Sequence, residues 1–167
     1  MKSGTGTKIH GYCNIYDDVV IGNCCTIASY VEIGRNVKIG DFCSIQAFTF
    51  LPEGVTIGNN VFIGPHVCFT NCRYPSANKK YNIQVAEDAL SYVKDDGEVF
   101  DLEVTAVNND VVIGAGSIIM CGITIGKGAI IGAGSLVLKD VPDNAKVIQR
   151  RIDDSEIPRS FRQSEEI

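Results

Sequence analysis

A large apolar residue, usually isoleucine, recurs at every sixth position along most of this chain, and this period constrains the fold more than any other feature. The series comprises Ile9, Ile15, Ile21, Ile27, Ile33, Ile39, Ile45, Leu51, Ile57, Ile63 and Phe69, then Val107, Ile113, Ile119, Ile125, Ile131 and Val137. An α-helix repeats every 3.6 residues and a half-buried strand every two, so neither explains a period of six. A short strand followed by a corner does, and three such hexads close one triangular coil. The period therefore predicts an all-β parallel β-helix formed by residues 1–167 as a single domain.

Two other positions of the hexad repeat with the aliphatic residue. Glycine follows it directly at eight places, and a small or β-branched residue usually comes four positions after it. We expect the aliphatic and the small residue to point inward, and the glycine to permit backbone geometries that other residues avoid. Stacked coils are spaced at about 4.8 Å, so residues three hexads apart should form ladders. Ile9, Ile27, Ile45 and Ile63 make one predicted ladder.

Composition limits the function classes. The net charge is −5, which opposes a general nucleic-acid surface because such a surface needs clustered cations. The start of the chain lacks the apolar run of a signal peptide, and no segment approaches the roughly 18 apolar residues of a membrane helix. We therefore predict a cytoplasmic protein without membrane association. Its seven cysteines are expected to be free thiols, including Cys25 and Cys43, which would stack within reach of a disulfide.

The repeat is interrupted over about residues 70–106. A coil cannot hold so many residues in its core, so the segment must loop outward, and long loops in compact folds are usually functional or disordered. Asp96-Gly97 between β-prone runs is typical of a hairpin turn, so we expect part of the loop to be ordered. The polar tail, about residues 143–167, is expected to cross the end of the helix or to fray.

The hexads IGNCCT, IGRNVK, IGDFCS, IGNNVF, IGAGSI, IGKGAI and IGAGSL match a known motif. Over about residues 9–142 the chain resembles the bacterial hexapeptide-repeat transferases. The resemblance implies left-handed coils, an exception to the usual crossover hand. It also implies acetyl-CoA as co-substrate, no metal, and a homotrimer in which the loop reaches a neighbouring subunit and helps to wall the active site.

The segment that enters the loop reads FTNCRYP from Phe69 to Pro75 and is similar to the FTNDxYPR signature of nucleotide-sugar N-acetyltransferases. Cys72 stands where that signature has aspartate, and Ser76 where it has arginine. The resemblance implies acetylation of an amino group on a UDP- or dTDP-linked sugar. It makes Asn71 a candidate catalytic residue, and makes Asn71, Arg73 and Tyr74 candidates for substrate binding.

The scarcity of histidine also favours an amine acceptor. A hydroxyl nucleophile needs a general base, whereas a neutral amine already carries a lone pair. His10 and His66 are the two histidines, and His10 lies in the first coil, far from the loop by coil count. His66 is a candidate catalytic residue; the alternative is a surface or inter-subunit residue, because its hexad position faces outward.

Residues after the loop are candidates for cofactor binding. Ala115 and Ala133 are three hexads apart and should stack on one edge. In the resembling family, backbone amides at these positions bind the pantetheine arm of CoA. Residues 132–142, GAGSLVLKDVP, resemble the family's GAGSxVxKDVP, which makes Lys139 a candidate for a CoA phosphate and Lys127 a second one.

Three alternatives use the same scaffold. An O-acetyltransferase would need His66 or another base. A γ-class carbonic anhydrase would need three histidines for each zinc, and two histidines at unmatched positions do not supply them. A non-catalytic β-helix is compatible with the hexads, although the FTN and GAGSxVxKDVP resemblances argue against it.

Overall fold

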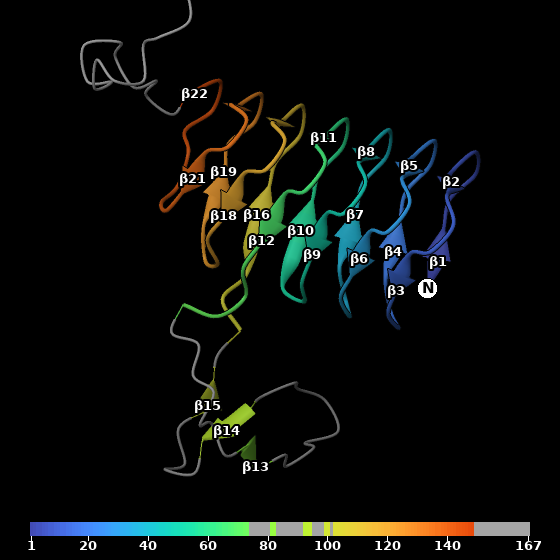
Figure 1. The fold of residues 1–167 in the computed structure, drawn as a ribbon, viewed down its shortest axis with the longest axis horizontal. Helices are drawn as coiled ribbons and strands as arrows, with labels where there is room; N and C mark the ends of the chain where they lie inside the picture. The colour runs from blue at the N-terminus through green and yellow to red at the C-terminus, as the bar shows by residue number, and fades with distance from the viewer. Residues whose placement is uncertain (74–80, 83–91, 95–98, 101, 149–167) are drawn as a thin grey trace, which may run out of the picture.

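The computed structural model describes residues 1–73, 81–82, 92–94, 99–100 and 102–148. Strands of two or three residues wind into stacked coils, and no α-helix occurs in these ranges. Figure 1 shows the coils side by side along the long axis, with one segment leaving the stack near its middle. The predicted left-handed parallel β-helix is confirmed. None of the described segments forms a helix long and apolar enough to cross a membrane.

The strands form three parallel sheets, one for each side of the triangular coil. Sheet A contains β1 (Lys2–Ser3), β4 (Val20–Ile21), β7 (Lys38–Ile39), β10 (Val55–Ile57), β16 (Thr105–Val107) and β19 (Thr124–Ile125). Sheet B contains β2 (Lys8–Ile9), β5 (Thr26–Ile27), β8 (Ser44–Ile45), β11 (Phe62–Ile63), β17 (Val112–Ile113), β20 (Ile130–Ile131) and β22 (Lys146–Val147). Sheet C contains β3 (Asn14–Ile15), β6 (Glu32–Ile33), β9 (Phe50–Leu51), β12 (Cys68–Phe69), β18 (Ile118–Ile119) and β21 (Leu136–Val137). The chain runs from A to B to C and back to A, so the helix has an A-to-B, a B-to-C and a C-to-A edge.

The predicted isoleucine ladder is confirmed in register. Ile9 pairs with Ile27, Ile27 with Ile45, and Ile45 with Ile63. Ile63 then pairs with Ile113, which lies beyond the interruption, so the inserted segment leaves the ladder unshifted. The structure therefore joins the coils on both sides of the loop into one continuous core.

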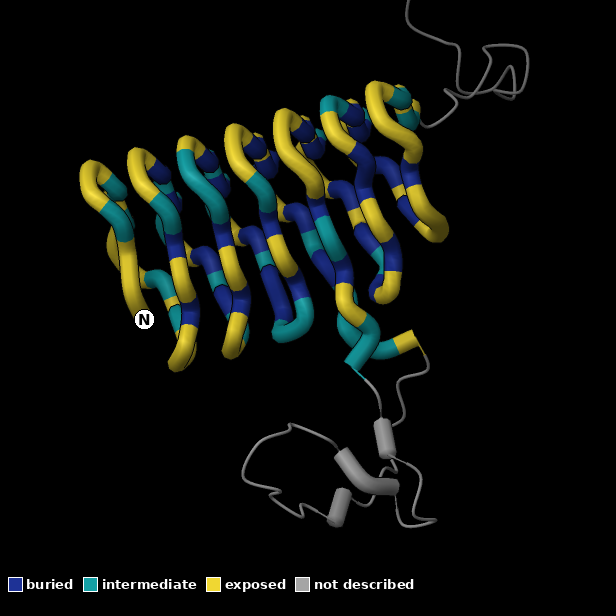
Figure 2. Tube along the Cα trace, turned by 180° about the vertical axis from the view of Figure 1, so that it is seen from behind, coloured by how far each residue is buried: buried dark blue, intermediate teal, exposed yellow. Residues whose placement is uncertain are grey.

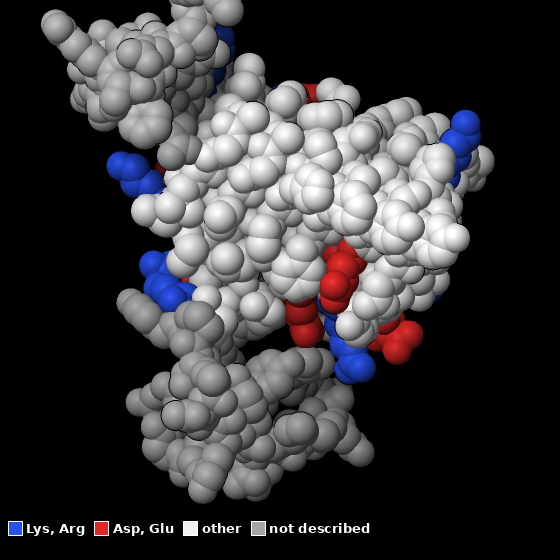
Figure 3. Space-filling view, viewed as in Figure 1, with Lys and Arg blue, Asp and Glu red and all other residues white. Residues whose placement is uncertain are grey.

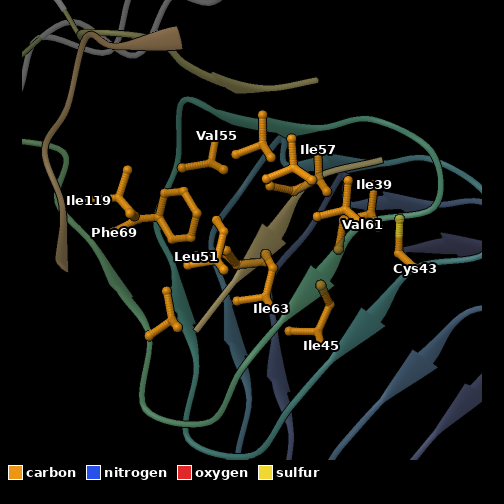
Figure 4. Close-up of a cluster of buried hydrophobic side chains, with 14 of the residues drawn as sticks. Ile39, Cys43, Ile45, Leu51, Val55, Ile57, Val61, Ile63, Phe69 and Ile119 are labelled. Carbon is orange, nitrogen blue, oxygen red and sulfur yellow. The ribbon is translucent and has the colours of Figure 1, made fainter. Parts of the chain in front are cut away.

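Aliphatic and small side chains fill that core as predicted. Ile27, Ile45 and Ile63 are fully buried, and so are the small-position residues Val19 and Val67. Figure 2 shows buried and exposed stretches alternating along the coils that follow the first, and Figure 4 shows Leu51, Phe69 and Ile119 packed inside the solenoid. Burial of these apolar side chains, at about 1.5–3 kcal/mol each, drives the short strands together.

The role predicted for the glycines after the aliphatic residue is wrong. Positive φ angles occur two positions later, at the fourth position of the hexad, as at Tyr12 (63°) and His66 (57°). The second-position glycines are needed for close approach instead. A Cβ on Gly64 would lie 2.6 Å from the Ala115 nitrogen, and one on Gly22 would lie 2.6 Å from the Gly40 carbonyl group. At Gly64 and Gly22 the next coil passes too near for a side chain.

The loop is partly ordered, as predicted. Its described pieces are β13 (Tyr81–Asn82), β14 (Tyr92–Lys94) and β15 (Val99–Phe100), which form an antiparallel sheet. Tyr92 pairs with Phe100, so the expected hairpin across Asp96-Gly97 is confirmed by its two strands, although the turn itself lies outside the described residues.

At the C-terminal end, β22 pairs with β20, so residues 143–148 of the predicted tail belong to the last coil. The rest of the tail lies outside the described residues.

The stacked thiols are free, as predicted. Cys25 and Cys43 are both buried, and the Cys43 N–H donates to Cys25 Sγ at 3.4 Å. Burial raises the pKa of the Cys43 thiol to about 11.

Candidate functional site

Asn71 stands where the chain leaves the solenoid after β12, on the C-to-A edge. The preceding Thr70 is held by its backbone N–H, which donates to the Ile119 carbonyl at 2.9 Å, and by its hydroxyl, which accepts from the Cys121 N–H at 3.0 Å. Asn71 itself is half-buried. The sheet therefore positions the first residues of the FTN motif, and Asn71 is a polar side chain that directly follows an anchored residue at the mouth of the loop.

Arg73 makes contacts that the sequence did not predict. Its guanidinium forms a forked pair with Glu103, with Nε–Oε1 at 3.3 Å and NH2–Oε2 at 2.9 Å, and donates to the Cys121 carbonyl at 3.3 Å. The bonds to Glu103 join the outgoing and returning arms of the loop, and the bond to Cys121 joins Arg73 to the next coil. Sequence reasoning missed Glu103 because it lies at the opposite end of the insertion from Arg73. Substrate contact by Arg73 stays a prediction, and Tyr74 lies outside the described residues.

The two predicted alanines lie together on the B-to-C edge. Ile113 pairs with Ile131, and the Gly134 N–H donates to the Ala115 carbonyl at 2.8 Å, so Ala115 and Ala133 occupy adjacent coils as predicted. Both are exposed. No acceptor for either backbone N–H is found in the described parts of the chain. Two parallel donors are therefore available to an extended ligand.

The A-to-B edge shows what such amides do when the chain satisfies them itself. There the N–H of Asn23 donates to Asp41 Oδ1 at 2.6 Å, that of Asp41 to Asn59 Oδ1 at 2.8 Å, and that of Asn59 to Asn109 Oδ1 at 2.8 Å. Small residues replace these side-chain acceptors at Ala115 and Ala133. The contrast leaves the N–H groups of Ala115 and Ala133 open to solvent and makes the B-to-C edge a candidate binding surface.

The predicted lysines lie on two different edges. Lys127 is on the A-to-B edge and pairs with Asp110 at 3.8 Å, away from Ala115 and Ala133. Lys139 is on the C-to-A edge, two coils beyond Asn71, and with Leu138 and Lys146 it lines a cavity of about 520 Å³ at the C-terminal end. The structure therefore gathers Asn71 and Lys139 on one edge and the free amides on another.

Four exposed rings also stack along the B-to-C edge. Ring centroids of Tyr12 and Tyr30 are 5.2 Å apart, those of Tyr30 and Phe48 5.1 Å, and those of Phe48 and His66 4.8 Å, with interplanar angles of 7° or less. Sequence reasoning did not find this aromatic column. The regular spacing of its members, one every three hexads, was the available signal.

His66 ends the column and is not beside Asn71 on the same edge. The strand β12 separates them, with His66 before it on the B-to-C edge and Asn71 after it on the C-to-A edge. His10 is exposed in the first coil. The two candidate catalytic residues therefore share a coil level but occupy different edges of the chain.

Sheets B and C present apolar residues outward on both sides of the open edge. Phe62, Val112 and Ile130 of sheet B and Ile118 and Leu136 of sheet C are each at least 40% exposed. In Figure 3 a broad uncharged face separates charged groups at the margins. Large exposed apolar surfaces usually mark interaction sites. Across the described ranges, no three histidine, cysteine or acidic side chains gather as a metal site.

Stacked hexads, an outward loop and an edge of free amides define a β-solenoid of the hexapeptide class. The chain belongs to the bacterial transferase hexapeptide (six repeats) family, whose pattern matches residues 4–35, 36–71 and 105–139.

Curated relatives are acetyltransferases by name. A galactoside O-acetyltransferase of Lactococcus lactis is 33% identical over 105 residues, which cover 59% of this chain and 44% of the relative. A chloramphenicol acetyltransferase of Agrobacterium fabrum is 48% identical over 60 residues, which cover 32% of this chain and 29% of the relative. This chain thus matches less than half the length of either.

Solved structures share the fold. A mutant of AntD, an N-acyltransferase from Bacillus cereus in complex with dTDP-4-amino-4,6-dideoxyglucose and coenzyme A, superposes with a TM-score of 0.69 at 24% identity, covering 90% of this chain and 82% of that one. PerB from Caulobacter crescentus, in complex with CoA and GDP-perosamine, superposes with a TM-score of 0.63 at 20% identity, covering 84% and 52%.

Proposed function

We propose that this protein transfers the acetyl group of acetyl-CoA to an amino group of a UDP- or dTDP-linked amino sugar. The observation that carries the proposal is the pair of N–H groups at Ala115 and Ala133, which are exposed and have no acceptor among the described residues. The small alanine side chains beside them let a ligand approach closely. An arm with amide carbonyls spaced along it, as in pantetheine, is a suitable acceptor for two such donors. Membership of the hexapeptide family and the acetyltransferase relatives support the same interpretation.

The acceptor side of the proposal rests on Asn71. Its amide oxygen can accept a hydrogen bond from the substrate amine and so direct the nitrogen lone pair at the thioester carbon. A C–N bond forms, the C–S bond breaks, the amine loses one proton, and the CoA thiolate leaves and takes up a proton. Lys139, on the same edge, would meet a CoA phosphate in this proposal.

A homotrimer would bring these groups together. Asn71 and the amides of Ala115 and Ala133 lie on different edges of one chain, so neither edge alone holds both substrates. Copies related by rotation about an axis parallel to the helix keep the same coil levels. One copy's loop edge can then face its neighbour's amide edge, and the apolar faces of sheets B and C supply the contact.

An O-acetyltransferase is the second candidate, because the Lactococcus lactis relative is named for that reaction. A hydroxyl acceptor needs a base within reach. His66 is exposed and lies at the coil level of Asn71, but its ring lies flat against Phe48. An amine acceptor needs no such base.

The test is release of free CoA from acetyl-CoA with a panel of UDP- and dTDP-linked amino sugars and their hydroxyl counterparts. We expect turnover with at least one amine, and a fall in kcat/KM of about 10²-fold in Asn71→Ala, since an orienting hydrogen bond is lost. Asn14→Ala, at an exposed position of sheet C, is the matched control and should retain wild-type rates. Turnover with hydroxyl acceptors alone would refute the proposal.

A further inference from the structure

The aromatic column has a free ring face at its His66 end, and this face looks along the B-to-C edge. Rings inside a parallel stack cover each other's faces, so only the faces at the two ends can meet a ligand. Tyr12 ends the column in the first coil and His66 ends it in the coil before the loop. No further ring among the described residues stacks on His66.

Beyond His66 the same position of the hexad is empty. Gly116 and Gly134 follow it in the next two coils, linked along the edge by bonds from the Gly116 N–H to the Pro65 carbonyl at 2.9 Å and from the Gly134 N–H to the Ala115 carbonyl at 2.8 Å. A Cβ on either glycine would meet nothing within 4 Å. The edge therefore has a half filled by rings and an open half, and the free amides of Ala115 and Ala133 border the open half.

We propose that the free ring face of His66 limits the length of the acyl group that the acyl-CoA site accepts. This inference rests on the proposed function. A chain held by the N–H groups of Ala133 and Ala115 runs along the open half of the edge. Its reacting carbon must reach the coil level of Asn71. His66 lies at that same level, one coil nearer the N-terminus than Ala115. The acyl group therefore abuts the His66 ring.

The orientation of the ring fits a wall better than a base. Its plane lies within 7° of the Phe48 ring, so its nitrogen lone pair and N–H lie in the ring plane, across the stacking direction rather than along the edge. An acetyl methyl group fits over Gly116 against the ring face. A longer acyl chain would have to displace a ring that is supported from behind by Phe48, Tyr30 and Tyr12.

Removing the ring tests this directly. His66→Gly frees one coil level, about 4.8 Å of edge, and glycine suits the positive φ at this position. We expect the ratio of kcat/KM for butyryl-CoA to that for acetyl-CoA to rise about tenfold or more, because each added methylene in an apolar site changes discrimination by that order. His66→Phe keeps a ring, at a φ that Phe48 also adopts, and should keep the wild-type ratio. Tyr12→Ala, three coils away, is the control.

A second measurement does not need the acceptor. The methyl proton resonance of [¹³C-methyl]acetyl-CoA should move upfield on binding to wild type and to His66→Phe, through the ring current, and should not move with His66→Gly. Two results would refute the role of His66 in limiting acyl length while leaving the use of acetyl-CoA intact. One is binding of acetyl-CoA to wild type without that shift, and the other is an unchanged ratio of kcat/KM for butyryl-CoA to that for acetyl-CoA in His66→Gly. Failure of wild type to bind acetyl-CoA would refute both the proposed function and the role of His66 in limiting acyl length.

Discussion

Replacement of Gly64 by alanine tests why glycine occupies the second position of the hexad. In Gly64→Ala the new Cβ would lie 2.6 Å from the Ala115 nitrogen and 3.0 Å from both the Ala115 Cα and the Gly114 carbonyl carbon. All three are backbone atoms, so no side-chain rotation relieves the contact. The two coils must separate by several tenths of an ångström, which strains the bond from the Gly64 N–H to the Ile113 carbonyl, now 2.8 Å.

Overpacking of this kind costs about 1–3 kcal/mol. At about 2–4 °C of Tm for each kcal/mol in a chain of this size, we expect Gly64→Ala to lower Tm by about 3–10 °C. The matched control is Gly132→Ala, at the same hexad position two coils later. Its nearest contact would be the Val147 carbonyl oxygen at 3.2 Å, so its loss should be distinctly smaller.

Differential scanning calorimetry and chemical denaturation of the two variants give the comparison. Equal destabilisation of both would show that the alanine side chain acts through backbone propensity and not through coil spacing, and would refute the reasoning. Gly64→Ala should also weaken acetyl-CoA binding, because it displaces the Ala115 N–H.

Three further predictions concern charge, cofactor and assembly. Because burial raises the folded-state pKa of Cys43 from 9.0 to about 11, the folded state holds this proton longer than the unfolded state, so the free energy of unfolding should fall as pH rises from about 9 to 11; denaturant titrations of Cys43→Ala should lack this component. Lys139→Ala should raise KM for acetyl-CoA several-fold while Lys127→Ala, on another edge and paired with Asp110, should not, and equal effects in steady-state kinetics would contradict the assignment. Sedimentation should show a trimer that Ile118→Asp weakens, and a monomeric wild type would exclude the shared site.

The ladder of isoleucines could be predicted from the sequence because a period of six, once recognised, determines both the facing of each side chain and the stacking of coils. Ile9 to Ile63 pair as expected, and Ala115 and Ala133 lie in adjacent coils as expected. The hand of the coil came from resemblance to a family, since spacing alone does not encode it.

Other features depend on distances between coils or across the insertion, which local patterns do not contain. Positive φ angles fall at Tyr12 and Phe48, residue types that give no sign of a left-handed backbone. The Arg73–Glu103 pair closes only when a long insertion brings its two ends together. For the same reason Glu103 could not be recognised from the sequence.

The two ends of the insertion are held by adjacent amides of a single coil. The Cys121 N–H donates to the Thr70 hydroxyl at 3.0 Å, and the Gly122 N–H donates to the Thr105 hydroxyl at 3.1 Å. The solenoid therefore holds both ends of the segment between these threonines at one corner of one coil, and the isoleucine ladder continues without interruption. A segment attached in this way can be exchanged, lengthened or shortened during evolution while the B-to-C edge keeps its form. The length and sequence of this segment are thus structurally independent of the edge that carries Ala115 and Ala133.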